Sequence, residues 1–188
     1  MVKIGAISLD IRHKKIPYNL GKFYEMSHEW LLDQDYVGLN GDSDFVENLY
    51  WEDRGAAVKE YWYLWRLKKT IDNEYFEYHI KLDVHLMAIK DVQVVVNNKN
   101  VKLQDGEINM TINGWVEFDP KNKLKTDSIT KFFYNHFLKK HLLHDVEFHK
   151  TKLKKDMMDF QLLVKKYFEF YNYGSNSPNF HPNRGIGY

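Results

Sequence analysis

The stretch "YFEYHIKLDVHLMAI", residues 75–89, decides the fold class, because its apolar and polar side chains alternate over more than ten residues. Side chains of a β-strand point to opposite faces in turn, so this pattern predicts a strand with one buried and one solvated face. The buried face would carry Phe76, Tyr78, Ile80, Leu82, Val84 and Leu86. The solvated face would carry Glu77, His79, Lys81, Asp83 and His85.

Further strands are expected on both sides of this stretch. Residues 107–119, "EINMTINGWVEFD", repeat the alternation, a second long extended pattern lies at 58–71, and shorter ones lie at 2–12, 44–51, 92–96 and 101–103. In the segment 58–71 the alternation places Trp62 on one face and Tyr61, Tyr63 and Trp65 on the other. Clean alternation of this kind is typical of antiparallel sheets that bury one face.

The first of three helical patterns precedes the central strands and ends at Gly38. The second covers 127–143 and the third covers 146–171; both follow the last strand, and a break is expected between them near His144-Asp145. The third places an apolar stripe at helical spacing: Val146, Leu153, Met157, Phe160 and Val164. The prediction is an α+β fold in which an N-terminal strand and helix precede an antiparallel sheet, about six or seven strands in all, packed on a long C-terminal helix. We expect one domain over 1–172 and a Gly/Asn/Pro-rich tail over 173–188.

This order of elements resembles the helix-grip fold of START domains and of the birch-pollen allergen family. The resemblance covers most of the chain, and it is one of topology. In those families a curved sheet wraps the C-terminal helix and often leaves an apolar cavity between them. The extra helix expected at 127–143 departs from that pattern.

Composition and missing motifs exclude several functional classes. The 188 residues carry a net charge of +1 and contain no cysteine, which removes disulfides, thiolate catalysis and cysteine-bound metal sites. No apolar run approaches the ~20 residues that span a bilayer, and Asp10 interrupts the N-terminal apolar segment, so a soluble cytoplasmic protein is expected. The glycine-rich phosphate-binding loops and the esterase elbow G-x-S-x-G are absent, and no cofactor is predicted.

Binding of a small hydrophobic or lipid-like molecule is the function that the sequence favours, ahead of catalysis. The ligand would occupy a cavity between the sheet and the C-terminal helix, where flexible methionines suit an adaptable pocket. The expected contacts are Tyr78, Ile80, Leu82, Met110, Ile112, Met157 and Phe160.

A metal-dependent hydrolase is a weaker alternative, suggested by four histidines in residues 136–150. His141, Asp145 and His149 share one face of a continuous helix, but the two imidazoles would lie ~12 Å apart and could not bind one ion together. The spacing is not that of a known metal motif. A polar helix face is therefore the preferred interpretation. Asp83 and His85 share a strand face and are a further acid–base pair, best interpreted as an ordinary charged surface.

A protein-interaction subunit without a ligand is the other alternative. The 16% aromatic content and the aromatic residues of the tail, Phe180 and Tyr188, could dock on a partner. Only 4 of the 27 basic residues are arginine, which disfavours nucleic acid. An anionic membrane surface could be attracted to the cluster Lys150, Lys152, Lys154 and Lys155.

Overall fold

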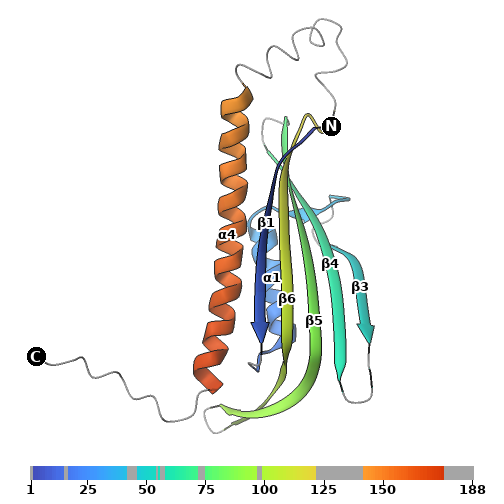
Figure 1. Cartoon of the computed structure of the whole chain (residues 1–188), viewed down its shortest axis with the longest axis vertical. Helices are drawn as coiled ribbons and strands as arrows, with labels where there is room; N and C mark the ends of the chain where they lie inside the picture. The colour runs from blue at the N-terminus through green and yellow to red at the C-terminus, as the bar shows by residue number, and fades with distance from the viewer. Residues whose placement is uncertain are drawn as a thin grey trace, which may run out of the picture.

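An antiparallel sheet with two helices on one face forms the described part of the protein (Figure 1). The computed structural model describes residues 2–14, 17–41, 46–53, 55, 58–71, 75–96, 99–121 and 142–175. The elements are β1 (Val2–Lys14), α1 (Leu20–Asp33), β2 (Val37–Gly38), β3 (Glu47–Asp53), β4 (Lys59–Thr70), β5 (Phe76–Val96), β6 (Lys99–Phe118) and α4 (Leu142–Ser175). The six strands follow the order β1-β6-β5-β4-β2, with β3 also paired to β4. The predicted α+β class, with a C-terminal helix on an antiparallel sheet, is confirmed.

The two central strands are longer than their sequence patterns indicated. The segments predicted separately at 75–89 and 92–96 are one strand, β5, and those at 101–103 and 107–119 are one strand, β6. A β-bulge between Met87 and Lys90 explains the difference, with Ala88 at φ 57°. A bulge shifts the in–out alternation by one residue, so a continuous strand reads as two.

Both helices cover the same face of the sheet, which we call the inner face. The stripe predicted on α4 is buried: Val146, Leu153, Met157, Phe160 and Val164 are at most 6% exposed. Residues of the inner face of the sheet, Tyr78, Ile80, Leu82, Ile112 and Val116, are at most 2% exposed and belong to the same core cluster. The predicted packing of the C-terminal helix is confirmed.

Close contact between α4 and the sheet depends on Gly114 of β6. A Cβ atom on that residue would lie 2.4 Å from the sulfur of Met157. At Gly106, beside the bulge, a Cβ would lie 2.4 Å from Cδ1 of Ile89 and 2.8 Å from the Met87 carbonyl oxygen. Only glycine permits these approaches without displacing a neighbour.

The helix α1 begins where the Asn19 side chain accepts a hydrogen bond from the Lys22 N–H at 2.9 Å, an N-cap. Its buried residues Phe23 and Leu31 face the core. The ring of Trp30 packs on Phe160 of α4 with centroids 5.2 Å apart. α1 therefore contacts both the sheet and α4.

The C-terminal helix α4 is already helical at Leu142 and passes through His144-Asp145 without the break that the sequence suggested. Most of the helix predicted at 127–143 lies outside the described residues. α4 continues to Ser175, three residues into the segment expected to be a tail, and the remainder of that segment also lies outside them. Among the described helices, none combines the length and apolar character needed to cross a membrane.

Candidate functional site

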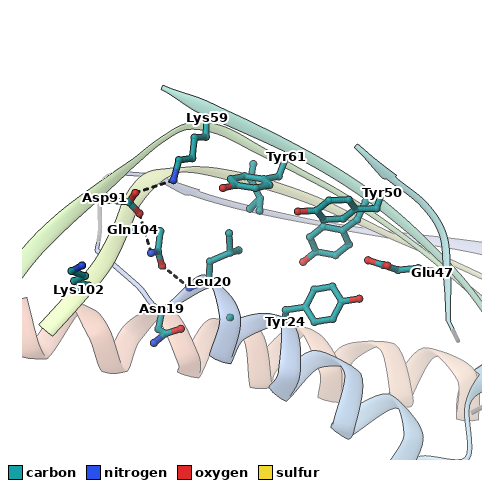
Figure 2. A pocket seen from close by; sticks show the side chains of 13 residues that line it. Asn19, Leu20, Tyr24, Glu47, Tyr50, Lys59, Tyr61, Asp91, Lys102 and Gln104 are labelled. Carbon is teal, nitrogen blue, oxygen red and sulfur yellow. Dashed lines mark hydrogen bonds and ion pairs between the residues drawn. The ribbon is translucent and has the colours of Figure 1, made fainter. Parts of the chain in front are cut away.

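A pocket of about 570 Å³ lies between the start of α1 and the inner face of the sheet (Figure 2). Tyrosines form much of its wall, and charged groups lie at its two ends. The lining residues are Asn19, Leu20, Gly21, Tyr24, Glu47, Tyr50, Lys59, Tyr61, Tyr63, Leu86, Asp91, Lys102 and Gln104.

One end of the pocket is built around Gln104, which ties the start of α1 to the sheet. Its backbone exchanges two hydrogen bonds with Tyr18, of 2.8 and 2.9 Å. Its side-chain oxygen accepts from the Leu20 N–H at 3.1 Å, and its amide nitrogen donates to Asp91 at 3.2 Å. Gln104 and Asp91 are register partners just beyond the bulge. The bulge therefore brings this polar pair to the edge of the pocket.

A lysine completes the same end. The Lys59 ammonium donates to the Asp91 carboxylate at 2.9 Å, which raises the pKa of Lys59 and lowers the pKa of Asp91. Both side chains are partly exposed, so the ion pair adds little to stability and can exchange for a ligand. Lys102 lies beside it, so this end holds two ammonium groups and one carboxylate (Figure 2).

The opposite end is aromatic and acidic. Tyr24 of α1 packs edge-on against Tyr63 and Trp65 of β4, with centroids 5.6 and 4.9 Å away. Burial raises the pKa of Tyr24, and a hydrogen bond to Glu47 raises it further. Burial likewise raises the pKa of Tyr50 and Tyr61. These phenols therefore stay protonated at neutral pH and offer O–H groups to a bound molecule.

The hydroxyl of Tyr63 has no hydrogen-bond partner within the described part of the chain. Its side chain lines the pocket and is only 1% exposed, and burial raises its pKa well above the usual value. An unsatisfied buried hydroxyl costs about 1–3 kcal/mol. The hydroxyl itself is closed off from solvent, so a ligand would reach it only if a neighbouring side chain moved.

A second hollow, of about 370 Å³, lies between β1 and the C-terminal half of α4. Its lining is largely charged, with Arg12, Lys165 and Glu169 beside Phe168. The ring of His13 stacks on Phe168 with centroids 4.3 Å apart. This hollow is smaller, and it has fewer aromatic walls than the pocket at α1.

The seven residues predicted to contact a ligand are packed in the core, at most 2% exposed, and none lines either hollow: Tyr78, Ile80, Leu82, Met110, Ile112, Met157 and Phe160. Their role as ligand contacts stays a prediction. Tyr24, Lys59 and Asp91 were not predicted as ligand contacts. The shared face of Tyr61 and Tyr63 was predicted from the alternation, but the position of α1 over that face has no local signal in the sequence.

Of the predicted metal ligands, His141 lies outside the described residues. Asp145 is exposed on α4, whereas His149 is buried and faces the core. Its Nδ1 is 2.7 Å from the Tyr78 hydroxyl, and its ring stacks on Phe76 at 4.0 Å. Within the described ranges, the group of histidine and carboxylate side chains close enough to share an ion is a different one, on the outer face of the sheet.

Asp83 and His85, suggested as an acid–base pair, each interact with other side chains. Asp83 accepts a hydrogen bond from the Trp62 indole at 2.7 Å, and His85 contacts Glu60 and stacks on Trp62. Trp62 is 42% exposed, while Tyr63 and Trp65 are buried. The two-sided arrangement of the aromatic residues on this strand is thus confirmed.

The lysine cluster on α4 is mostly exposed, as expected of a solvated helix face. Lys150 is half-buried, and its Nζ lies 3.4 Å from Glu147 Oε1. The ammonium group of Lys152 lies over the Phe148 ring. Lys154 and Lys155 are exposed. Attraction of this surface to anionic membranes stays a prediction.

Comparison with known proteins gave no match to a protein family, to a curated protein or to a solved structure.

Proposed function

We propose that this protein binds a small molecule with an aromatic or alicyclic body and an anionic group, in the pocket between α1 and the sheet. The observation that carries the proposal is the 570 Å³ pocket itself, with tyrosines along its wall and two lysines at one end. The proposal retains small-molecule binding but places the ligand against α1 rather than against α4.

The size and lining of the pocket support a ligand of this kind. Sites for small molecules span about 300–1,000 Å³ and combine aromatic walls with a few polar groups. Tyr24, Tyr50, Tyr61 and Tyr63 supply flat walls and hydroxyls. This lining is more polar than that of a lipid cavity, so it favours a ring-bearing amphipathic molecule over an acyl chain.

The charge distribution supports an anionic group at one defined end. Lys59 and Lys102 outnumber Asp91 there, whereas Glu47 lies at the other end (Figure 2). A carboxylate or sulfonate would be attracted to the lysines and repelled by Glu47. The ligand would therefore bind in one orientation.

The helix-grip topology is part of the same proposal. A long C-terminal helix on the inner face of an antiparallel sheet supports it. In this protein, α1 covers part of the same face and forms one wall of the pocket.

Anilinonaphthalene sulfonate, which joins aromatic rings to an anionic group, is a suitable probe. We expect one molecule to bind the folded protein, with weaker binding in Lys59→Gln and Lys102→Gln, because each variant loses an ammonium group that attracts the sulfonate. Lys81→Gln, on the outer face, is the matched control and should bind like the wild type. Equal affinities in all four proteins would refute the proposed site. A co-purified molecule detected by native mass spectrometry would identify the natural ligand class.

A further inference from the structure

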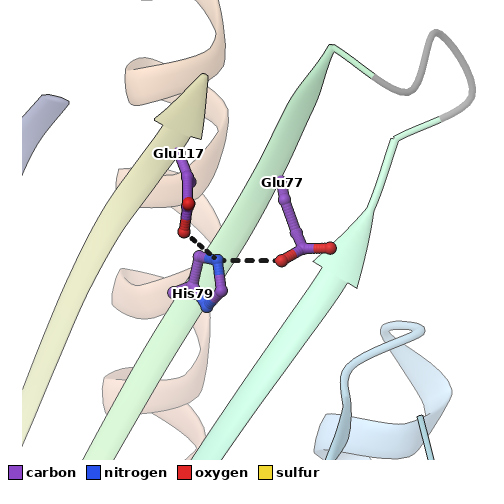
Figure 3. Close-up of side chains that lie close together, drawn as sticks. All are labelled: Glu77, His79 and Glu117. Carbon is purple, nitrogen blue, oxygen red and sulfur yellow. Dashed lines mark ion pairs between the residues drawn. The ribbon is translucent and has the colours of Figure 1, made fainter. Parts of the chain in front are cut away.

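Two glutamates and a histidine meet on the outer face of the sheet, opposite the helices and away from the pocket (Figure 3). Glu77 and His79 lie on β5 and point to the same face. Glu117 of β6 is the register partner of Glu77. Like charges directly opposite each other in a sheet destabilise it, so this pairing calls for a compensating positive charge.

The imidazole lies between the two carboxylates. Its Nε2 is 3.0 Å from Glu77 Oε1 and 3.1 Å from Glu117 Oε2. Neither contact has hydrogen-bond geometry, because Nε2 has no hydrogen-bond partner within the described ranges. The nitrogen is therefore directed between the two oxygens rather than at either of them.

The cluster is also poorly solvated. His79 and Glu117 are each 7% exposed, and the second carboxylate oxygen of Glu117, Oε1, is buried without a hydrogen-bond partner in the described structure. The Glu77 side chain is 15% exposed and receives a 3.4 Å contact from the Thr70 hydroxyl. A buried carboxylate without a partner is costly unless it is protonated, paired or bound to a metal.

Two lysines also flank the cluster, because strand register places Lys3 opposite Glu117 and Lys68 opposite His79. Lys3 itself lies over the Trp115 ring, 4.7 Å from its centroid.

The ring of His79 is held in place. It stacks on Trp115 with centroids 5.1 Å apart and an interplanar angle of 3°. This contact fixes the plane of the imidazole, which contains the Nε2 atom that lies beside both carboxylates. Such orientation before binding is what a specific metal site requires.

We propose that Glu77, His79 and Glu117 form a binding site for a divalent transition-metal ion, for which zinc is the best match. Zinc takes imidazole nitrogen and carboxylate oxygen at about 2.0–2.2 Å, which places tetrahedral ligands about 3.4 Å apart. The present nitrogen–oxygen spacings need to widen by only a few tenths of an ångström. Magnesium and calcium prefer all-oxygen ligands, so the histidine disfavours them. Three protein ligands leave one coordination position for water or another small ligand.

Calorimetric titration of tag-free, chelator-treated protein with zinc chloride tests the site directly. We expect one zinc ion per chain, bound at least about tenfold more weakly by Glu77→Gln and by Glu117→Gln, since each variant loses one of three ligands. Asp83→Asn removes a carboxylate from the same strand face and should leave the affinity unchanged. His149→Gln should also leave it unchanged, because His149 belongs to the core.

Thermal unfolding supplies a second readout that does not depend on calorimetry. Zinc should raise the Tm of the wild type and of Asp83→Asn, but not of the two glutamate variants. Without metal, Glu117→Gln should be at least as stable as the wild type, because it relieves the repulsion from Glu77. Absence of zinc binding by the wild type would overturn the proposal. So would zinc binding retained at full affinity in both glutamate variants.

Discussion

The hydroxyl of Tyr78 on β5 and Nδ1 of His149 on α4 form a 2.7 Å hydrogen bond inside the core. Burial raises the pKa of Tyr78 to about 12 and lowers the pKa of His149. The phenol therefore keeps its proton and donates it, and the imidazole proton lies on Nε2. This bond links the C-terminal helix to the central strand through two residues for which the sequence suggested other roles.

Tyr78→Phe should destabilise the protein by about 1–3 kcal/mol, because it leaves the buried Nδ1 of His149 without a partner. Urea unfolding followed by circular dichroism measures the change. Tyr50→Phe is the control, since Tyr50 is half-exposed and should lose little. A loss below 0.5 kcal/mol at Tyr78, an order-of-magnitude limit for surface changes, would show that the hydrogen bond is not important for stability.

Replacement of tyrosine by phenylalanine at Tyr63 should stabilise the protein, in contrast to the same change at Tyr78. Tyr63→Phe removes a buried hydroxyl that has no partner in the described structure, so the ligand-free protein should become more stable by about 1 kcal/mol. The Tm measured without added ligand checks this. A clear decrease in Tm would mean that this hydroxyl is already satisfied in the free protein.

Stability should fall as the pH is lowered below 6.5. Burial lowers the pKa of His13 and His149 in the folded protein; at His149, Lys152 adds to this and Asp145 opposes it. Below 6.5 the unfolded chain takes up protons that the folded protein does not, so the free energy of unfolding decreases with falling pH. Unfolding curves between pH 7.5 and pH 5, about the range where histidine titrates, measure the slope. His149→Gln should reduce the slope of the free energy of unfolding against pH, by as much as the contribution of one bound proton. An unchanged slope would contradict the lowered pKa of His149.

Packing of α4 on the sheet predicts a large difference between two of its residues. Phe160 is 1% exposed and contacts Trp30, so Phe160→Ala should cost about 3–5 kcal/mol. Lys155 is exposed, so Lys155→Ala should cost well under 1 kcal/mol. Chemical denaturation of both variants provides the comparison. Equal, small losses would contradict the packing of this helix.

Two glycines of β6 should differ in their tolerance of alanine. At Gly106 the new methyl group would meet the backbone oxygen of Met87, which cannot move without disrupting the bulge. At Gly114 it would meet the flexible end of Met157. Gly106→Ala should therefore be the more destabilising, within the roughly 1–3 kcal/mol typical of overpacking. The reverse order in thermal unfolding would show that the bulge can adapt.

The sequence determined the features that depend on neighbouring residues. Alternation along residues 75–89 identified both faces of β5, and the spacing of Leu153, Met157 and Phe160 identified the buried side of α4. These predictions succeed because the periods of two and 3.6 residues are properties of consecutive side chains. The alternation did not show that residues 75–96 form one strand, because the bulge at Ala88 changed its phase.

The tertiary structure decided which residues meet across the chain. Strand register places Glu117 opposite Glu77, and the docking of α1 on β6 through Gln104 opens the pocket beside Lys59. Neither relationship has a local signature, since the partners lie tens of residues apart and their contact depends on register and helix position. The core residues expected to hold a ligand pack against α4, whereas the pocket lies where α1, not α4, faces the tyrosines of β4.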